Sequence, residues 1–335
     1  MRVTVPSLAL DGADRRVRRS AGDRIADTGL LALTAAASAT VIVTIAAIIY
    51  KVIDGASLSI STFGLGFLGH ITWNTVAVPG YPQGFFGAAS FIYGTAVTSA
   101  MALILALPIG IAIGLFLSLL RPGRIAAVIG PLVELLAAIP SVVLGLWGIL
   151  VLGPVLAHPI EPWLHDVLGW IPIFSDPSLT GLGVFTAGLI LTIMVVPIIA
   201  SISRELFLSV PADLKDGALA LGMTRWEMVR GVVLSSTRSG LAATAILGLS
   251  RAMGEAIAVT QVIGGGSQSQ INANFFANGD TIASRIANQF INATSKLWLS
   301  SIFFLAVLLL VIGLVTNLLA QLIVRRYALL QGGGR

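Results

Sequence analysis

The sequence of 335 residues contains no cysteine and few charged residues. The absence of cysteine excludes disulfide bonds, catalysis by a thiolate and any metal site built on cysteine. Asp, Glu, Lys and Arg make up only 10% of the chain, whereas an ordinary soluble domain has about 25%. The three histidines are isolated in the sequence, and their spacing predicts no metal site. The scarcity of charge points instead to a chain whose surroundings are apolar.

Lysine is scarce as well, and its few positions are informative. A phosphate-binding loop of the GxxxxGK[ST] type needs a lysine directly after a glycine. The only lysines are Lys51, Lys215 and Lys296, and none of them follows a glycine. The chain therefore has no nucleotide-binding loop of this type, and any nucleotide chemistry belongs to a partner.

Apolar residues, by contrast, are abundant. They make up 56% of the sequence, and the mean hydropathy of +0.95 is typical of a membrane protein. An apolar run of about 20 residues can cross ~30 Å of hydrocarbon as a helix. Six such runs predict an all-α polytopic membrane protein with six transmembrane helices, at residues 28–53, 92–119, 125–156, 179–203, 239–263 and 297–324.

The basic residues indicate how these helices are oriented. Of the 20 Lys and Arg residues, 16 lie in four segments: 1–27, 121–124, 204–238 and 325–335. Because Lys and Arg are enriched on the cytoplasmic side, we expect these segments and both termini in the cytoplasm. The predicted organisation is a basic tail (1–27), a six-span domain (28–324) and a second tail (325–335). The basic charge follows from this topology, so we expect contact with membrane lipid and none with nucleic acid.

Segment 204–238 is the longest polar interruption between two apolar runs. Its first half predicts a short helix, which Gly222 ends. Thr224 and Glu227 have the spacing of a capping box and predict the start of a second short helix. Two interpretations remain open: a projecting pair of helices that receives a protein partner, or an amphipathic loop at the lipid surface.

This segment resembles the EAA loop of ABC importer permeases. Asp216, Gly217 and Ala218, followed after three residues by Gly222, match the positions of Glu-Ala-Ala and Gly in that loop. The sequence departs from the pattern at three positions. Asp216 replaces the glutamate, Gly217 replaces the first alanine, and Ser235 stands where proline is usual. The resemblance implies docking to a cytoplasmic ATPase that binds ATP and Mg²⁺, while this chain binds no cofactor itself. The residues implied in coupling are Asp216, Gly217, Ala218, Gly222, Thr224 and Glu227.

Arg251 and Glu255 lie deep in the fifth apolar run. About 12 residues into a helix corresponds to ~18 Å, close to the middle of the bilayer. An ionisable side chain costs about 2.5–3.5 kcal/mol at that depth, so a pair of them needs a reason. Four residues apart, they would share one helix face. Either they neutralise each other within the bundle, or Arg251 offers its planar donors to an oxyanion while Glu255 orients or releases it.

Three longer strings narrow the family: ELLAAIPSVVLGLWGI at 134–149, SRAMGEAIAVTQVIGG at 250–265 and GDTIASRIANQF at 279–290. They are similar to phosphate-specific ABC importer permeases of the PstC type. The resemblance implies the MetI-like fold of type I ABC importer permeases, in a bacterial plasma membrane. It implies that Arg251 and Glu255 act on inorganic phosphate as it passes between this chain and a second, PstA-type permease. The further partners it implies are a PstB-type ATPase dimer and an extracytoplasmic PstS-type phosphate-binding protein.

Proline marks two further regions. Pro140 and Ser141 lie inside the third apolar run, where a proline frees a backbone carbonyl that protein or cavity water must satisfy. These two residues either line the pathway or only kink a packed helix. The proline-rich stretch 154–177 is expected to be an outer loop. In the outer segment 264–296, Asp280 is expected to cap a short helix that meets a substrate-binding protein or forms an outer gate, with a plain surface loop as the open alternative.

Three functions other than that of a phosphate permease would share some of these features. A permease for sulfate or molybdate would share every feature above except the PstC-like strings. A phosphate-sensing membrane scaffold would keep segment 204–238 but tolerate the loss of Arg251. A membrane enzyme would need a convergent set of catalytic residues, and the apolar runs offer too few. The predicted function is therefore that of a transport subunit and not of an enzyme.

Overall fold

The computed structural model describes residues 21–120, 123–265 and 271–332. The chain divides into two compact units, Met1–Lys51 and Val52–Arg335, and each is described by itself. The described part of the first unit is helical and belongs to α1 (Ala21–Phe63), whose last turns belong to the second unit. The basic tail up to residue 20, residues 121–122 of the predicted basic turn, and the last three residues of the C-terminal tail lie outside the described residues.

Six helices among the described residues are long and apolar enough to cross a membrane. This confirms the predicted number of spans and the all-α class. Many large apolar side chains of the first, third and sixth spans are exposed, as expected for helices whose solvent is lipid. The spans are Ala26–Phe63, Ala89–Leu119, Ser141–Leu168, Val184–Leu208, Arg225–Gly254 and Lys296–Leu322.

The third span begins later than the sequence predicts. Helix α4 (Arg124–Ala137) ends before Pro140, and a new helix, α5 (Ser141–Trp147), starts directly after it. Pro140 has an extended backbone (φ −58°, ψ 137°), and its ring lacks the N–H that would continue the helix of α4. The prediction that Pro140 and Ser141 lie inside the span is therefore wrong, because they lie at its start.

The chain after α5 stays helical where an outer loop was predicted. Two π-helical turns, Gly148–Leu152 and Leu156–Ile160, alternate with α6 (Gly153–Val155) and α7 (Glu161–Leu168). Pro154 and Pro162 lie in the first turns of α6 and α7, where proline is tolerated, and Pro159 lies inside a π turn. The prediction of a loop over 154–168 is wrong for this reason.

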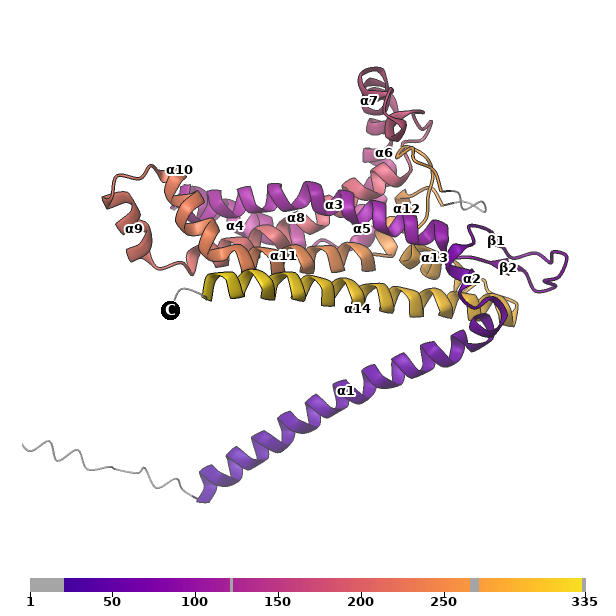
Figure 1. Cartoon of the computed structure of the whole chain (residues 1–335), viewed down its shortest axis with the longest axis horizontal. Helices are drawn as coiled ribbons and strands as arrows, with labels where there is room; N and C mark the ends of the chain where they lie inside the picture. Colours follow the sequence, from indigo (N-terminus) through magenta and orange to yellow (C-terminus); the bar gives the residue numbers. More distant parts are fainter. Residues whose placement is uncertain (1–20, 121–122, 266–270, 333–335) are drawn as a thin grey trace, which may run out of the picture. The chain divides into compact units, whose positions relative to one another are not determined.

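Helices α3 (Ala89–Leu115) and α8 (Val184–Leu208) lie side by side in the second unit (Figure 1). A Cβ added to Gly114 of α3 would lie 2.9 Å from the Cβ of Ser203 in α8. Small residues of this kind let membrane helices approach closely. Helices α11 (Leu234–Gly254) and α12 (Ile257–Val262) pack on the same core. Its buried side chains include Ala102, Ala106, Ile190, Leu191, Val195, Ile199, Ala252, Ala258, Val259 and Val262.

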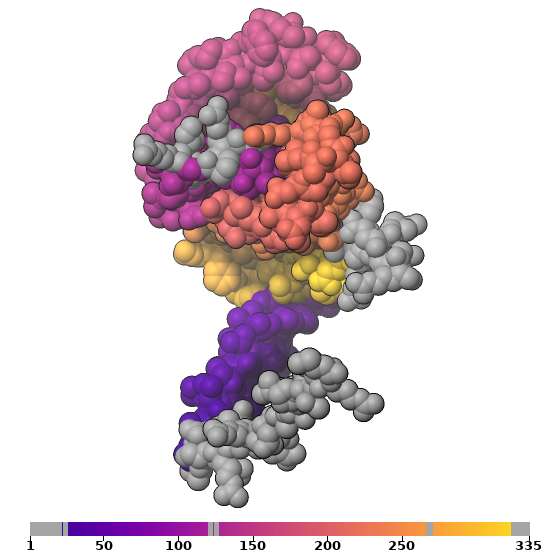
Figure 2. Space-filling view, turned by 90° about the vertical axis from the view of Figure 1, so that its left-hand side faces the viewer, coloured from indigo at the N-terminus to yellow at the C-terminus, as the bar shows by residue number. Residues whose placement is uncertain are grey.

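The second unit has two different ends. Helices α9 (Ala212–Ala220) and α10 (Arg225–Met228) lie at one end, and Figure 2 looks onto it with this segment in orange at the surface. Helix α13 (Ile282–Gln289) lies at the other end. Helix α14 (Lys296–Gly332) runs between the two ends (Figure 1).

An aromatic cluster closes the end that carries α13. The short helix α2 (Gly66–Gly69) is followed by strands β1 (Trp73–Asn74) and β2 (Phe85–Phe86), which pair antiparallel with Trp73 opposite Phe86. Their apolar side chains pack with α3, α13 and α14. The buried members of this cluster are Phe67, Trp73, Phe86, Ala88, Phe91, Ile282, Leu297, Ile302 and Leu305.

Candidate functional site

The corner predicted at Gly222 has the geometry of a Schellman motif. Gly222 has a φ of +85°, a left-handed conformation that favours glycine. Its N–H donates to the carbonyl of Leu219 (3.0 Å), and the N–H of Met223 donates to that of Ala218 (3.2 Å). Helix α9 therefore ends as the sequence predicts, with the carbonyls of Ala218 and Leu219 paired across the corner.

The capping box is also confirmed. The Thr224 hydroxyl accepts from the N–H of Glu227 (3.3 Å), and the Glu227 carboxylate accepts from the N–H and the hydroxyl of Thr224 (both 2.8 Å). The helix that starts here is not short, however. It continues from α10 through the π-helical turn Val229–Val233 into α11, so the fifth span and the corner at Gly222 are joined by one continuous helix.

Of the six residues predicted to couple this chain to an ATPase, one is buried and five are exposed. Ala218 is buried with Phe207, Val210, Met228, Val229 and Val233, and this small core fixes α9 against the following helix. Asp216, Gly217, Gly222, Thr224 and Glu227 are exposed. Two large apolar side chains beside them are exposed as well, Leu221 at 86% and Trp226 at 64%. The segment thus presents a firm, partly apolar surface.

The helix of the fifth apolar run breaks after Gly254, between Arg251 and the residues that follow Glu255. Helix α11 ends at Gly254, Glu255 has an extended backbone (φ −72°, ψ 118°), and α12 begins at Ile257. Ala256 is the N-cap of α12, and one carboxylate oxygen of Glu255 accepts from the N–H of Ala258 in its first turn (3.3 Å). The predicted continuous helix over 239–263 is therefore wrong, because the span Arg225–Gly254 ends before Glu255 and the short helix α12 follows it.

This break separates Arg251 from Glu255. Arg251 lies in the last turn of α11 and is exposed, whereas Glu255 follows the end of that helix and is half-buried. No ion pair joins the two among the described residues, so the interpretation as a mutually neutralising pair on one helix face is wrong. The Arg251 guanidinium keeps its donors available, and a site beside it suits an anion.

The structure brings Pro140 and Ser141 to the level of the break. A Cβ on Gly145 of α5 would lie 3.0 Å from the Cα of Ala258, and one on Gly148 would lie 2.5 Å from Val262. The later glycine lies against the later residue of α12, so α5 and α12 run parallel. Both helices therefore begin at a similar level, α5 after Pro140 and α12 after Glu255.

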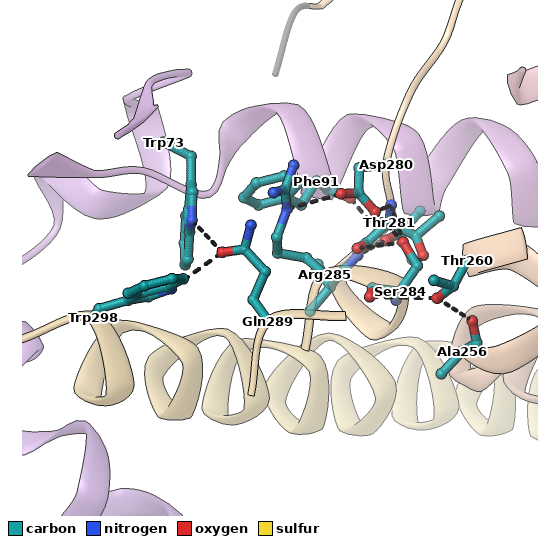
Figure 3. Close-up of polar contacts among 12 residues, drawn as sticks. Trp73, Phe91, Ala256, Thr260, Asp280, Thr281, Ser284, Arg285, Gln289 and Trp298 are labelled. Carbon is teal, nitrogen blue, oxygen red and sulfur yellow. Dashed lines mark hydrogen bonds and ion pairs between the residues drawn. The ribbon is translucent and has the colours of Figure 1, made fainter. Parts of the chain in front are cut away.

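Sequence reasoning missed a buried ion pair at the other end of the unit. Arg285 Nε lies 2.8 Å from Asp280 Oδ2, and the side chains are only 3% and 8% exposed (Figure 3). Asp280 does not cap α13 as predicted, because Thr281 is the N-cap and forms a capping box with Ser284. Burial raises the pKa of Asp280 above its usual value, while Arg285 acts in the opposite direction. The sequence signal was an arginine four residues into a short outer helix.

A family model described as the inner membrane component of binding-protein-dependent transport systems matches residues 106–329, more than half of the chain. The chain belongs to this family. The family description makes it an inner-membrane transport component, and its six spans make it a multi-pass one.

Proteins that align with most of this permease share one name. "Phosphate transport system permease protein PstC" of Mesorhizobium japonicum is 38% identical and aligns over 93% of each chain. The PstC proteins of Pasteurella multocida and Haemophilus influenzae are both 40% identical to it. Their alignments cover 84% of this chain and 86% of the first protein, and 88% of this chain and 91% of the second. These relatives are transport subunits and not enzymes.

Solved structures agree on the fold of the permease. A chain of a bacterial alginate ABC transporter, in complex with an alginate pentasaccharide-bound periplasmic protein, has a TM-score of 0.55 at 17% identity. The match covers 89% of this chain and 97% of that one. A chain of the inward-facing methionine transporter MetNI has a TM-score of 0.50 at 20% identity and covers 71% and 96%. These matches confirm the ABC importer permease fold.

Proposed function

We propose that this chain is the permease subunit of an ATP-driven importer that moves inorganic phosphate into a bacterial cell. The observation that carries the proposal is the set of PstC relatives, 38–40% identical over at least 84% of this chain. The exposed guanidinium of Arg251 beside a break in the fifth span supports it, because arginine suits recognition of an oxyanion.

The pathway passes the break in the fifth span. Arg251 contacts the phosphate through its planar donors, and Glu255 at the start of α12 orients the arginine or releases it between states. Pro140 and Ser141 lie at the same level at the start of α5 and complete the pathway. A backbone that leaves the helix inside a membrane protein is tolerated where it lines a cavity or is buried in protein, which supports this placement.

The driving force comes from partner subunits. Segment 204–238 docks to an ATPase dimer of the PstB type, which binds ATP and Mg²⁺, because its corner is exposed and internally braced. Asp216, Gly217 and Gly222 lie at this surface with Thr224 and Glu227, while Ala218 anchors it. A PstA-type second permease and an extracytoplasmic PstS-type phosphate-binding protein complete the assembly.

The chain lies in the plasma membrane with both termini and segment 204–238 in the cytoplasm. The tail 1–27, the membrane domain 28–324 and the tail 325–335 form its three parts. The distribution of Lys and Arg supports this orientation, because 16 of the 20 lie in segments assigned to one side.

Reconstitution tests this function. The chain is assembled with the three proposed partners in proteoliposomes, and uptake of labelled phosphate is measured with and without ATP. We expect ATP-dependent uptake that unlabelled phosphate blocks and that sulfate and molybdate leave unaffected. Uptake of sulfate or molybdate in place of phosphate would assign another oxyanion. A fully assembled complex that moves none of the three would favour a sensing scaffold.

A further inference from the structure

The ion pair of Asp280 and Arg285 has no part in the function proposed above, although burying two charges demands compensation. Several contacts of both side chains supply this compensation. Asp280 Oδ1 accepts hydrogen bonds from the N–H of Thr281 (2.9 Å) and from the hydroxyl of Ser284. The Arg285 guanidinium lies over the ring of Phe91 at 4.7 Å and near that of Trp73 at 5.9 Å (Figure 3). Only arginine combines a bidentate charge with a flat surface that stacks on aromatic rings.

This pair holds α13 tightly against α3. The N–H of Ile282 donates to the hydroxyl of Thr95 in α3 (3.0 Å). A Cβ on Gly94 would lie 2.0 Å from the carbonyl oxygen of Asp280, so the two backbones are in direct contact. At the far end of α13, the amide oxygen of Gln289 accepts from the indole N–H groups of Trp73 (2.8 Å) and Trp298 (3.1 Å). Both ends of α13 are thus fixed.

The same segment also holds α12, the short helix that follows the break after Gly254. The N–H of Gly279 donates to the carbonyl of Ile263 (3.0 Å), directly after α12. The Thr260 hydroxyl lies 3.4 Å from the carbonyl oxygen of Ser284 (Figure 3). Gly279 and Ser284, which neighbour the ion pair in sequence, therefore contact α12 and the residue after it, and Glu255 accepts from the first turn of α12.

Helix α11, which precedes the break, is connected differently. It is continuous with α10 and with the capping box of Thr224, so a displacement of the coupling corner is transmitted along one continuous helix. That helix ends at Gly254, directly before the extended Glu255. Helix α11 also packs on α3, α8 and α14, but it alone is continuous with the corner, whereas α12 is attached to the segment of the ion pair.

We propose that Asp280 and Arg285 are positioning residues: their ion pair fixes α13 and, through it, α12 and Glu255, while α11 carries Arg251 about a hinge at residues 254–256. The anchoring and the hinge follow from the contacts of this chain. Their consequence for transport rests on the proposed function. Movement of the coupling segment would then change the separation of Arg251 and Glu255.

Distance measurements test the hinge directly. The chain has no cysteine, so introduced cysteines alone carry spin labels. One pair is Leu247→Cys and Ile257→Cys, on exposed positions of α11 and α12, and the other is Ile257→Cys and Ala287→Cys, on α12 and α13. In the assembled complex, a non-hydrolysable ATP analogue should shift the 247–257 distance distribution and leave the 257–287 distribution unchanged. An unchanged 247–257 distribution, or an equal shift in both pairs, would overturn the hinge.

Substitution of the ion pair tests the anchor. Asp280→Asn should broaden the 257–287 distribution and lower coupled uptake by about tenfold or more while ATP hydrolysis continues, since a misplacement of ~1 Å can cost up to ~100-fold. The double variant Asp280→Asn, Arg285→Met removes both charges and should regain thermal stability, because no buried charge is left unpaired. It should still show the broad distribution and low uptake. Recovery of uptake together with stability in the double variant would mean that the pair serves stability alone.

The two proposals fail separately. A complex that shows the hinge in the distance measurements but takes up no phosphate contradicts the proposed function and leaves the anchor standing. A complex that takes up phosphate with no change between residues 247 and 257 contradicts the hinge and leaves the function standing.

Discussion

At the scale of single residues, Gly94 is where α3 and the segment before α13 approach most closely. A Cβ on Gly94 would lie 2.0 Å from the carbonyl oxygen of Asp280, a backbone atom that has no rotamer to change. We therefore expect Gly94→Ala to destabilise the protein by about 1–3 kcal/mol, as over-packing does elsewhere. The measurement is the melting temperature of the purified chain in detergent.

Gly313 offers the matched control. It also lies in a long membrane helix, α14, and an added Cβ would meet no atom within 4 Å. Gly313→Ala should leave the melting temperature unchanged or raise it slightly, because alanine is the better helix former by up to ~1 kcal/mol. Equal melting temperatures for the two variants would contradict the close approach at Gly94.

Residue-level predictions from the sequence succeeded where the interaction is local. The capping box of Thr224 and Glu227 spans three residues, and the conformation of Gly222 follows from its place at a helix end. The pairing of Asp280 with Arg285 was missed because its stability depends on Phe91 and Trp73, which are distant in sequence. The interpretation of Arg251 and Glu255 as a neutralising pair, one of the two left open, needed a continuous helix, and that helix ends between them.

At the scale of secondary-structure elements, the corner between α9 and α10 depends on a left-handed residue. Proline cannot adopt the φ of +85° found at Gly222, and it would remove the N–H that donates to Leu219. We expect Gly222→Pro to cost about 3 kcal/mol locally and to lower both binding of the ATPase subunit and phosphate uptake. Co-purification of the ATPase and uptake assays measure the two effects.

The same position provides a graded comparison. Asparagine tolerates the left-handed conformation better than other residues with side chains, and it keeps the N–H. Gly222→Asn should therefore retain most of the ATPase binding that Gly222→Pro loses. If the proline variant bound the ATPase and transported phosphate as well as the wild type, the corner would have no role in coupling.

The number of helices was predictable from apolar run lengths, but their ends were not. Averaged hydropathy does not detect a single extended residue, so the run 125–156 hid the break at Pro140 and the run 239–263 hid the one at Glu255. The second break has no proline, and it is held by contacts of α12 with α5 and α13. The predicted loop after residue 154 is helical because prolines at helix starts cost little.

At the scale of the whole molecule, the orientation in the membrane is open to a labelling test. Met223 is exposed at 41% in the coupling corner, and Ile291 at 91% after α13. Because the chain lacks cysteine, Met223→Cys and Ile291→Cys each give one labelling site. A membrane-impermeant maleimide added outside intact spheroplasts should label Cys at position 291 and reach position 223 only after lysis. The reverse pattern would place the coupling segment outside the cell.

The central claim is that phosphate crosses the membrane beside Arg251, at the break in the fifth span. The most direct test is ATP-dependent uptake of labelled phosphate by the assembled complex carrying Arg251→Ala, with Leu247→Ala as the control on an exposed position of the same helix outside segment 204–238. We predict that Arg251→Ala abolishes uptake while the complex still assembles, and that Leu247→Ala retains uptake. Normal uptake by an assembled Arg251→Ala complex would contradict the claim.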